Sequence, residues 1–242
     1  KAIIYGDTDS CYFSAYSTLK KDIDKGLIPW TKESVVALYD QIGEEVNATF
    51  PQFMLDTFHV PKTRGEVIKA GREIVGSKAL FITKKRYAAL IIDKEGKRQD
   101  TKGKPGKVKA MGLDLKRSDT PKVVQDFLSD ILMDVLTGSQ REEIIEKVRD
   151  FKYKFADRPA WEKGTPKRVN NLTNYTREEE RLGKANMPGH VRAAMNWNNL
   201  KRMHSDNYSM QIIDGMKTIV CKLKDNPLGY TSVGYPTDEI HI

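Results

Sequence analysis

The chain has 242 residues, 39% of them hydrophobic and 31% charged, with a net charge of +8 and a pI near 9.2. This composition is typical of a globular protein with room for one large or two modest domains, and it excludes a disordered chain. No stretch has the roughly 18 consecutive apolar residues that cross a bilayer, and the start is unlike a signal peptide. We therefore expect a soluble, cytoplasmic protein with no membrane partner.

The excess of Lys and Arg indicates a polyanionic partner, because each cation that neutralises a phosphate releases condensed counterions. Nucleic acid is the leading candidate, and solvated surface charge is the alternative. The two cysteines, Cys11 and Cys221, have no neighbouring Cys or His at metal-ligand spacing. We interpret both as buried reduced thiols and expect no zinc site.

The first predicted element is a β-hairpin with acids at its turn. Short apolar runs at residues 2–5 and 11–13 flank the polar residues 6–10. In extended backbone, residues i and i+2 point the same way, so Asp7 and Asp9 are predicted to present two carboxylates near one point.

A helix is predicted next, with Thr31 as its N-cap. Its buried face consists of Val35, Leu38, Tyr39, Ile42 and Val46. Pro51 is predicted to end this helix or to start a second short one around residues 53–55.

Residues 67–93 change to the composition of a sheet, with many β-branched and aromatic residues. The predicted strands are residues 67–75, 79–83 and 86–93. Residues 94–97 are predicted to form a hairpin turn, and the basic, glycine-rich residues 102–107 a flexible domain junction.

Beyond the junction the sequence is mainly helical. Thr120 and Pro121 are predicted to begin a helix with an apolar stripe from Val124 to Val135. A capping-box pattern at Ser139 and Glu142 predicts the start of a second helix, and the pair can form a helical hairpin.

The last part of the chain is less regular. Residues 157–187 are polar with weak periodicity, and residues 190–199 are predicted to be helical. Residues 210–213 and 217–223 read as a hairpin around an Asp-Gly turn, and residues 235–242 as strand-like. Because the chain starts on a Lys and both ends are strand-like, we expect it to be a piece of a longer protein.

Two adjacent carboxylates suit a hard cation such as Mg²⁺, which often takes one or two protein carboxylates plus substrate phosphates. Two such ions roughly 3.5–4 Å apart can activate an attacking oxygen and stabilise a leaving one in phosphoryl transfer. One alternative is an acidic turn in which Asp7 and Asp9 only bond backbone N–H groups. Another is the Asp-x-Asp of a metal-dependent glycosyltransferase.

The sequence Tyr-Gly-Asp-Thr-Asp-Ser at residues 5–10 resembles motif C of family B replicative DNA polymerases. Downstream, Lys-Lys-Arg-Tyr at residues 84–87 resembles another motif of that family. Residues 106–125, 188–192 and 226–229 resemble the palm-to-thumb passage and thumb segments of the T-even-like phage type. The elements occur in the family's order along nearly the whole chain.

The resemblance implies roles for individual residues. It makes Asp9 a direct ligand of two Mg²⁺ ions, with Mn²⁺ as an alternative metal, and Asp7 a less essential neighbour of the same ions. Glu73 matches a palm-strand acid near that site, which makes it a third candidate metal ligand, and a surface carboxylate is its alternative reading.

The implied DNA-binding residues are Lys84, Lys85, Arg86, Tyr87 and Lys109. The resemblance places Lys85 and Lys109 at the minor groove, where a cation meets acceptors common to all base pairs. Tyr87 is aromatic and can pack against a sugar or base. The basic stretch has an alternative reading as an edge strand protected by charge.

The resemblance also implies an α+β fold: a partial palm with an antiparallel sheet and packed helices at residues 1–106, then a mainly helical thumb with a small β-hairpin at residues 107–242. The resemblance implies that motif A, motif B, the exonuclease domain and the C-terminal tail that docks a sliding clamp lie outside this chain. The expected partners are primer-template DNA, deoxynucleoside triphosphates, an N-terminal polymerase portion and, through the missing tail, the clamp. We expect part of a DNA polymerase that is inactive alone; the alternative is a non-catalytic duplex-binding module.

Overall fold

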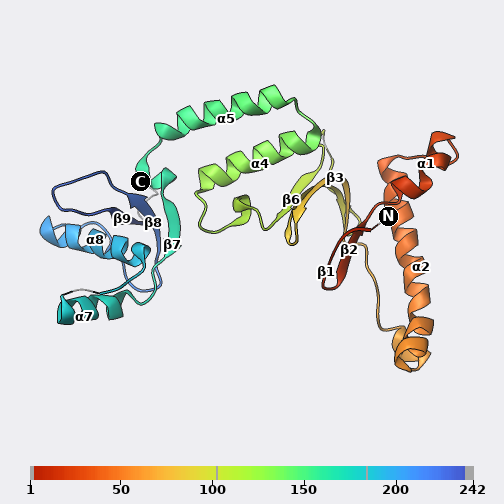
Figure 1. The fold of residues 1–242 in the computed structure, drawn as a ribbon, viewed down its shortest axis with the longest axis horizontal. Helices are drawn as coiled ribbons and strands as arrows, with labels where there is room; N and C mark the ends of the chain where they lie inside the picture. Colours follow the sequence, from red (N-terminus) through yellow and green to blue (C-terminus); the bar gives the residue numbers. More distant parts are fainter. Residues whose placement is uncertain (1–2, 102, 184, 238–242) are drawn as a thin grey trace. The chain divides into compact units, whose positions relative to one another are not determined.

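The computed structural model describes residues 3–101, 103–183 and 185–237, and it has the predicted α+β fold (Figure 1). The chain divides into two compact units. The first comprises residues 1–112 and 132–138, and the second residues 113–131 and 139–242. The boundary expected after residue 106 falls before the strand Lys107–Met111 (β6), which pairs with the sheet of the first unit. No helix in the described part of the chain is long and apolar enough to cross a membrane.

The predicted acidic hairpin is present as strands Ile3–Asp7 (β1) and Ser10–Phe13 (β2). A short helix that the sequence analysis did not predict, Tyr16–Asp24 (α1), follows it. Cys11 on β2 is exposed, contrary to the expectation of a buried thiol, because the hairpin has only two strands; Cys221 is buried as predicted.

The helix predicted to have Thr31 as its N-cap is Lys32–Phe58 (α2), and Thr31 caps it through reciprocal hydrogen bonds with Ser34. The prediction that Pro51 ends this helix or starts a second one was wrong, since α2 continues through it. A short helix, Lys62–Gly65 (α3), packs against this part of α2, and the glycine brings it close to the Pro51 backbone. This tertiary contact outweighs the hydrogen bond that proline removes.

The first unit contains a four-stranded antiparallel sheet. Its strands are Ile74–Thr83 (β3), Arg86–Lys94 (β4), Lys97–Arg98 (β5) and β6, and β4 pairs with the other three. The turn predicted at residues 94–97 is confirmed, with positive φ at Glu95 and Gly96. Residues 88–92 of β4 are all buried and form the core of this unit.

Two boundaries of this sheet differ from the prediction. Gly76 does not separate two strands; the register between β3 and β4 shifts there and the strand continues. Residues 67–73 are not a strand, because contacts with α2 replace strand pairing. The Asn47 side chain bonds both the N–H and the C=O of Ala70, at 2.6 and 3.0 Å.

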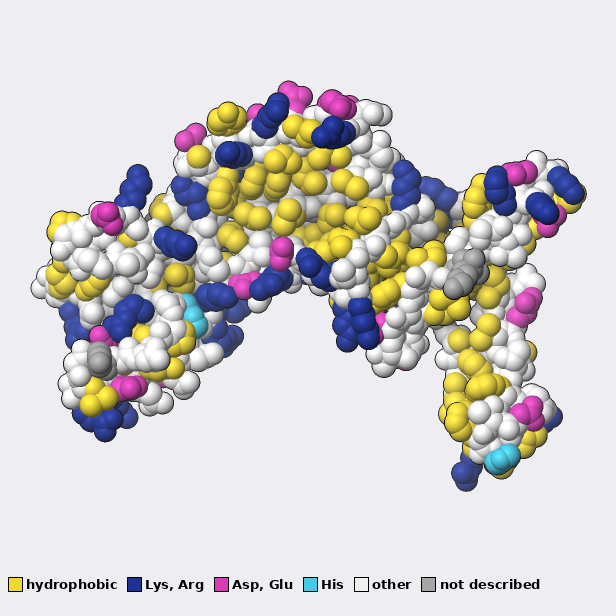
Figure 2. All heavy atoms as spheres, in the orientation of Figure 1, with side chains coloured by type: hydrophobic (Ala, Val, Ile, Leu, Met, Phe, Trp, Pro, Cys, Tyr) yellow, Lys and Arg dark blue, Asp and Glu magenta, His cyan; other side chains and the backbone are white. Residues whose placement is uncertain are grey.

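The second unit begins with a short 3₁₀ turn, Asp114–Lys116 (η1), and most of the helix Lys122–Thr137 (α4). Helix Arg141–Ala156 (α5) lies beside α4 as the predicted hairpin, and the Phe127 and Phe151 rings stack with centroids 3.8 Å apart (Figure 1). The capping box of α5 uses Gln140 and Glu143, one residue later than predicted. Figure 2 shows apolar side chains along both helices.

The rest of this unit is more ordered than its polar sequence predicted. It consists of Ala160–Lys163 (α6), Thr165–Arg168 (β7), Leu172–Leu182 (α7), Gly189–Met203 (α8), Lys217–Lys222 (β8) and Ser232–Pro236 (β9). Helix α8 confirms the helix predicted at residues 190–199. The core of this unit consists of Val169, Leu172, Val191, Ala194, Met195 and Ile212. Of the strand-like segment 235–242, the structure describes only residues 235–237.

The hairpin predicted from residues 210–213 and 217–223 is wrong. Strand β8 instead lies between β7 and β9 in a three-stranded antiparallel sheet. Residues 210–213 are not a strand because α8 satisfies their backbone groups. Asn198 bonds the N–H and C=O of Ile212, both at 2.9 Å, and Trp197 donates to the Met210 carbonyl. The Asp214 carboxylate accepts from the Leu172 N–H at the start of α7.

Candidate nucleic-acid interface and acidic turn

The acidic turn consists of Thr8 and Asp9, between the paired residues Asp7 and Ser10. Thr8 has a φ of 49°, a left-handed conformation that non-glycine residues adopt rarely. Asp9 therefore lies in the turn rather than in extended backbone. Asp7 and Asp9 thus do not lie on one continuous extended strand, which was the basis for predicting that their side chains point the same way.

The two aspartates have different surroundings. The Asp7 side chain is 25% exposed, and its Oδ2 lies 4.0 Å from Lys85 Nζ. Asp9 is exposed, and within the described residues its carboxylate has no hydrogen-bond or ion-pair partner. Asp9 is thus the acid whose oxygens are available to a ligand.

The basic turn connects β3 and β4. Lys84 and Lys85 form this turn between the paired residues Thr83 and Arg86, and Lys85 has a φ of 61°. The Lys85 N–H donates to the Tyr5 hydroxyl at 2.9 Å, which links the basic turn to the acidic hairpin. Figure 2 shows Lys and Arg side chains gathered at this end of the sheet.

Four aromatic rings join the two turns. Tyr5 and Tyr12 of the hairpin pack against Phe81 and Tyr87 of the sheet, with ring centroids 5.4 to 5.7 Å apart. The Tyr12 and Tyr87 hydroxyl oxygens lie 2.8 Å apart in a hydrogen bond. Burial and this bond raise the pKa of Tyr87 to about 12. The cluster fixes the acidic turn relative to the basic one.

The burial of Tyr87 bears on its predicted role. Its side chain was expected to pack against a sugar or base, but the residue is only 4% exposed, and its ring packs against the protein's own rings. Lys84, Lys85 and Arg86, in contrast, are all exposed.

Lys109 lies on β6, and its Nζ is 2.7 Å from Glu73 Oε1. Glu73 precedes β3, and its backbone C=O accepts from Glu95 N–H at 2.9 Å. The hydrogen bond from Lys109 lowers the pKa of Glu73. Two predicted site residues therefore pair with each other.

This pairing makes a testable prediction about pH. Because the folded-state pKa of Glu73 is depressed, the stability from this pair is present above the unfolded-state value of about 4.3 and is lost as pH falls through the folded value. We expect Lys109→Met to move the pKa of Glu73 up toward its ordinary value in an NMR carboxyl titration. An unchanged titration would contradict the pairing.

The carboxylates meet part of the requirement for a magnesium site. Asp7 and Asp9 supply the hard oxygen ligands that Mg²⁺ prefers. Within the described residues, however, no three His, Cys, Asp or Glu side chains come together as a possible metal-binding group. Asp7, Asp9 and Glu73 thus do not form a three-carboxylate site. The carboxylates of Asp7 and Asp9 are therefore suited to supply part of the coordination of a Mg²⁺ ion. The remaining ligands would have to come from groups other than these two side chains and Glu73.

Several Lys and Arg side chains of the second unit are paired with acids. Asp119 accepts from Arg117 at 3.1 Å and from Lys167 at 2.9 Å, and both cations hold its pKa well below the usual range. Arg192 donates to Glu179 at 2.6 and 2.7 Å. These three cations are thus engaged with acids of their own unit.

The sequence analysis gave no structural role to three residues that hold the acidic turn, the basic turn and the Glu73 segment in place. These residues are Tyr5, Tyr12 and Arg72. Tyr5 and Tyr12 are paired across the hairpin, so their symmetric placement around the acidic turn was an available signal. The Arg72 guanidinium donates to Asp93 at 2.6 Å and to Asp40 of α2. No local pattern identified these distant partners.

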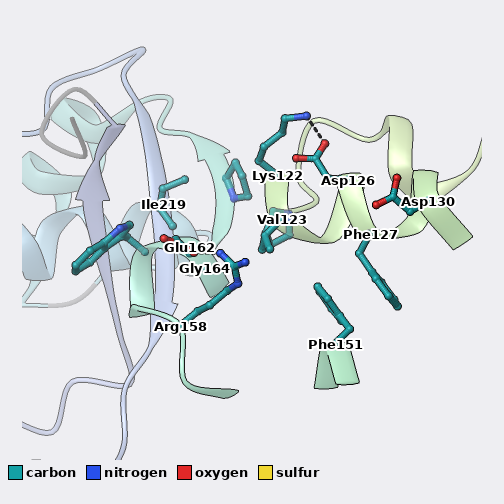
Figure 3. Close-up of a pocket in the computed structure, with 13 residues that line it drawn as sticks. Lys122, Val123, Asp126, Phe127, Asp130, Phe151, Arg158, Glu162, Gly164 and Ile219 are labelled. Atoms are coloured by element: carbon teal, nitrogen blue, oxygen red, sulfur yellow. Dashed lines mark hydrogen bonds and ion pairs between the residues drawn. The ribbon is translucent and has the colours of Figure 1, made fainter. Parts of the chain in front are cut away.

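A pocket of about 620 Å³ lies in the second unit (Figure 3). Phe127, Phe151 and Trp161 give it an apolar wall, and ion pairs join Lys122 to Asp126 and Arg158 to Glu162. None of the predicted site residues lines it.

Comparison with known proteins gives two kinds of match. The sequence model of DNA polymerase family B matches residues 59–219. The chain is 26% identical over 244 residues to the DNA-directed DNA polymerase of Escherichia phage RB69, and 25% identical over 248 residues to that of Enterobacteria phage T4. Each alignment covers 97% of this chain and 26% of the relative. The chain thus spans about a quarter of the length of these relatives.

Proposed function

Since this chain belongs to DNA polymerase family B, we propose that it is part of a template-directed DNA polymerase that adds deoxynucleotides to a primer 3′ end. The family assignment leaves no place for the glycosyltransferase alternative. The observation that carries the proposal is the aromatic cluster, which holds an exposed carboxylate and a basic turn beside each other. Phosphoryl transfer at a primer end uses both kinds of group, carboxylate ligands for the metal and cations for the DNA backbone.

In this proposal the acidic turn is motif C. Asp9 would hold the catalytic Mg²⁺ directly, and Asp7 would be a less essential neighbour whose charge is partly balanced by Lys85. When bound, a pair of divalent ions supplies Lewis-acid stabilisation of the attacking and leaving oxygens. This chain's own contribution is to hold the Asp9 carboxylate at a fixed turn, exposed and without a competing partner among the described residues.

The DNA contacts come from the basic turn and from β6. Lys84 and Arg86 are exposed cations suited to phosphates, and Lys85 and Lys109 are assigned to the minor groove. Tyr87 supports these contacts from within the aromatic cluster. A contact with acceptors common to all base pairs tests pairing geometry without reading sequence.

The first unit corresponds in this proposal to the C-terminal part of a palm domain, and the second to a thumb that grips the duplex. Because the relatives are much longer, we infer that an N-terminal portion with exonuclease, motif A and motif B completes the active site. Primer-template DNA, deoxynucleoside triphosphates and a sliding clamp are the remaining partners. The complete enzyme works in a phage replication complex within a bacterial host.

A second candidate is a duplex-binding module of a split polymerase that does no chemistry. The pairing of Glu73 with Lys109 favours it, because that acid is engaged with a DNA-binding cation. The two candidates share the DNA contacts and differ in the role of Asp9.

Both candidates predict duplex binding by this chain. Because binding releases counterions from the DNA, we expect the affinity for a primer-template duplex to fall at least about tenfold between 50 and 200 mM salt. We also expect the affinity to depend little on the DNA sequence. Fluorescence anisotropy with two duplexes of unrelated sequence measures both properties. Salt-independent binding, or no binding, would count against the proposal.

A further inference from the structure

One face of the first unit's sheet brings Lys109 next to the aromatic cluster. Tyr87 and Ala89 point to the same face of β4, because side chains alternate along a strand. Lys109 is paired with Ala89 across β4 and β6, so its side chain lies on that face. Ala89 is 3% exposed and small, which leaves room for the lysine stem above it.

Glu73 holds the end of that lysine. The two side chains meet at 2.7 Å, and the Lys109 side chain is only 28% exposed, whereas that of Glu73 is 55% exposed. The acid therefore covers the more enclosed cation from the solvent side. Lysine has a long flexible stem, so an ion pair of this kind selects one of its many conformations.

The segment that carries Glu73 is itself anchored. The neighbouring Arg72 is bound to Asp93, whose side chain is 2% exposed, and to Asp40 on α2. The backbone C=O of Glu73 accepts from Glu95. The position of the Glu73 carboxylate is thus set by contacts with the sheet and with α2.

We propose that Glu73 is a positioning residue that orients Lys109 toward the DNA, rather than a ligand of the catalytic metal. The inference rests on the proposed function, since it assumes that Lys109 contacts duplex DNA. It replaces the role of metal ligand that the sequence resemblance implied for Glu73. On this face of the sheet, Glu73 then orients Lys109 toward the DNA. Asp9 remains the proposed metal ligand.

The test measures duplex binding by the full chain in EDTA, where no metal ligand can contribute. The variants are Glu73→Gln, Lys109→Met and the double variant. Glu44→Gln is the matched control, because it removes the same charge from an exposed position on α2. Glu73→Asp is the second variant, since it keeps the charge but withdraws it by one methylene.

We expect Glu73→Gln to bind the duplex about fivefold more weakly than Glu44→Gln, and Glu73→Asp about fivefold more weakly than the unsubstituted chain, the value of one oriented contact. When Lys109 is already replaced by Met, adding Glu73→Gln should give the same duplex affinity as adding Glu44→Gln. Equal affinities of Glu73→Gln and Glu44→Gln in the unsubstituted background would overturn the inference, as would an effect that persists without Lys109. If the unsubstituted chain itself binds no duplex, the proposed function fails, and this inference with it.

Discussion

Replacing Asp9 with Asn should reduce nucleotide incorporation by roughly 10³-fold or more in a polymerase completed with the N-terminal portion, because several kcal/mol of metal-borne charge stabilisation is lost. The carboxylate is exposed and has no partner among the described residues, so the substitution should leave the fold intact. Single-turnover primer extension at saturating Mg²⁺ measures the effect.

Two controls accompany this variant. Asp56→Asn removes an exposed carboxylate from α2 and should leave incorporation unchanged. Asp7→Asn should have a smaller effect than Asp9→Asn, because the Asp7 carboxylate is partly enclosed and lies beside Lys85. If incorporation survives in Asp9→Asn, the assignment of that residue as the metal ligand is wrong.

Replacing Gly112 with Ala should destabilise the first unit by about 3 kcal/mol, through a strained backbone and a steric collision. Gly112 has a φ of 63°, and a Cβ there would collide with the Lys85 carbonyl oxygen and lie 3.1 Å from Arg86 Cγ. The backbone oxygen cannot move without displacing the basic turn. Duplex affinity should fall together with stability.

Gly26→Ala is the control that separates backbone strain from steric collision. Gly26 also has a positive φ, of 73°, but a Cβ there has no neighbour within 4 Å. It should therefore cost only the backbone strain, about 1 kcal/mol. Equilibrium urea unfolding followed by circular dichroism gives both values. Equal destabilisation by the two substitutions would mean that the close approach of Gly112 to the basic turn is unimportant.

Elements with local signals were predictable from sequence. Thr31 capped its helix as expected, and turns formed in the predicted segments 6–10 and 94–97. The errors arose where distant residues satisfy the backbone. Asn47 bonds Ala70 and prevents an early start of β3, and Asn198 bonds Ile212 and prevents the predicted second hairpin.

In the candidate site, too, local features were predictable and contacts between distant residues were not. Sequence placed acids at one turn and cations at another, and the structure has both. The links between them were not predictable, because they join residues far apart: Tyr5 with Lys85, Tyr12 with Tyr87, and Glu73 with Lys109. Such pairings depend on how the strands align, which single-residue patterns do not encode.

The central claim is that this chain supplies the acidic turn and the duplex grip of a polymerase whose remaining parts lie in an N-terminal portion. Primer extension by the chain alone, by the N-terminal portion alone and by the mixture tests it most directly. We expect no incorporation by either part and template-directed incorporation by the mixture. Incorporation by this chain alone, or by the N-terminal portion without it, would contradict the account.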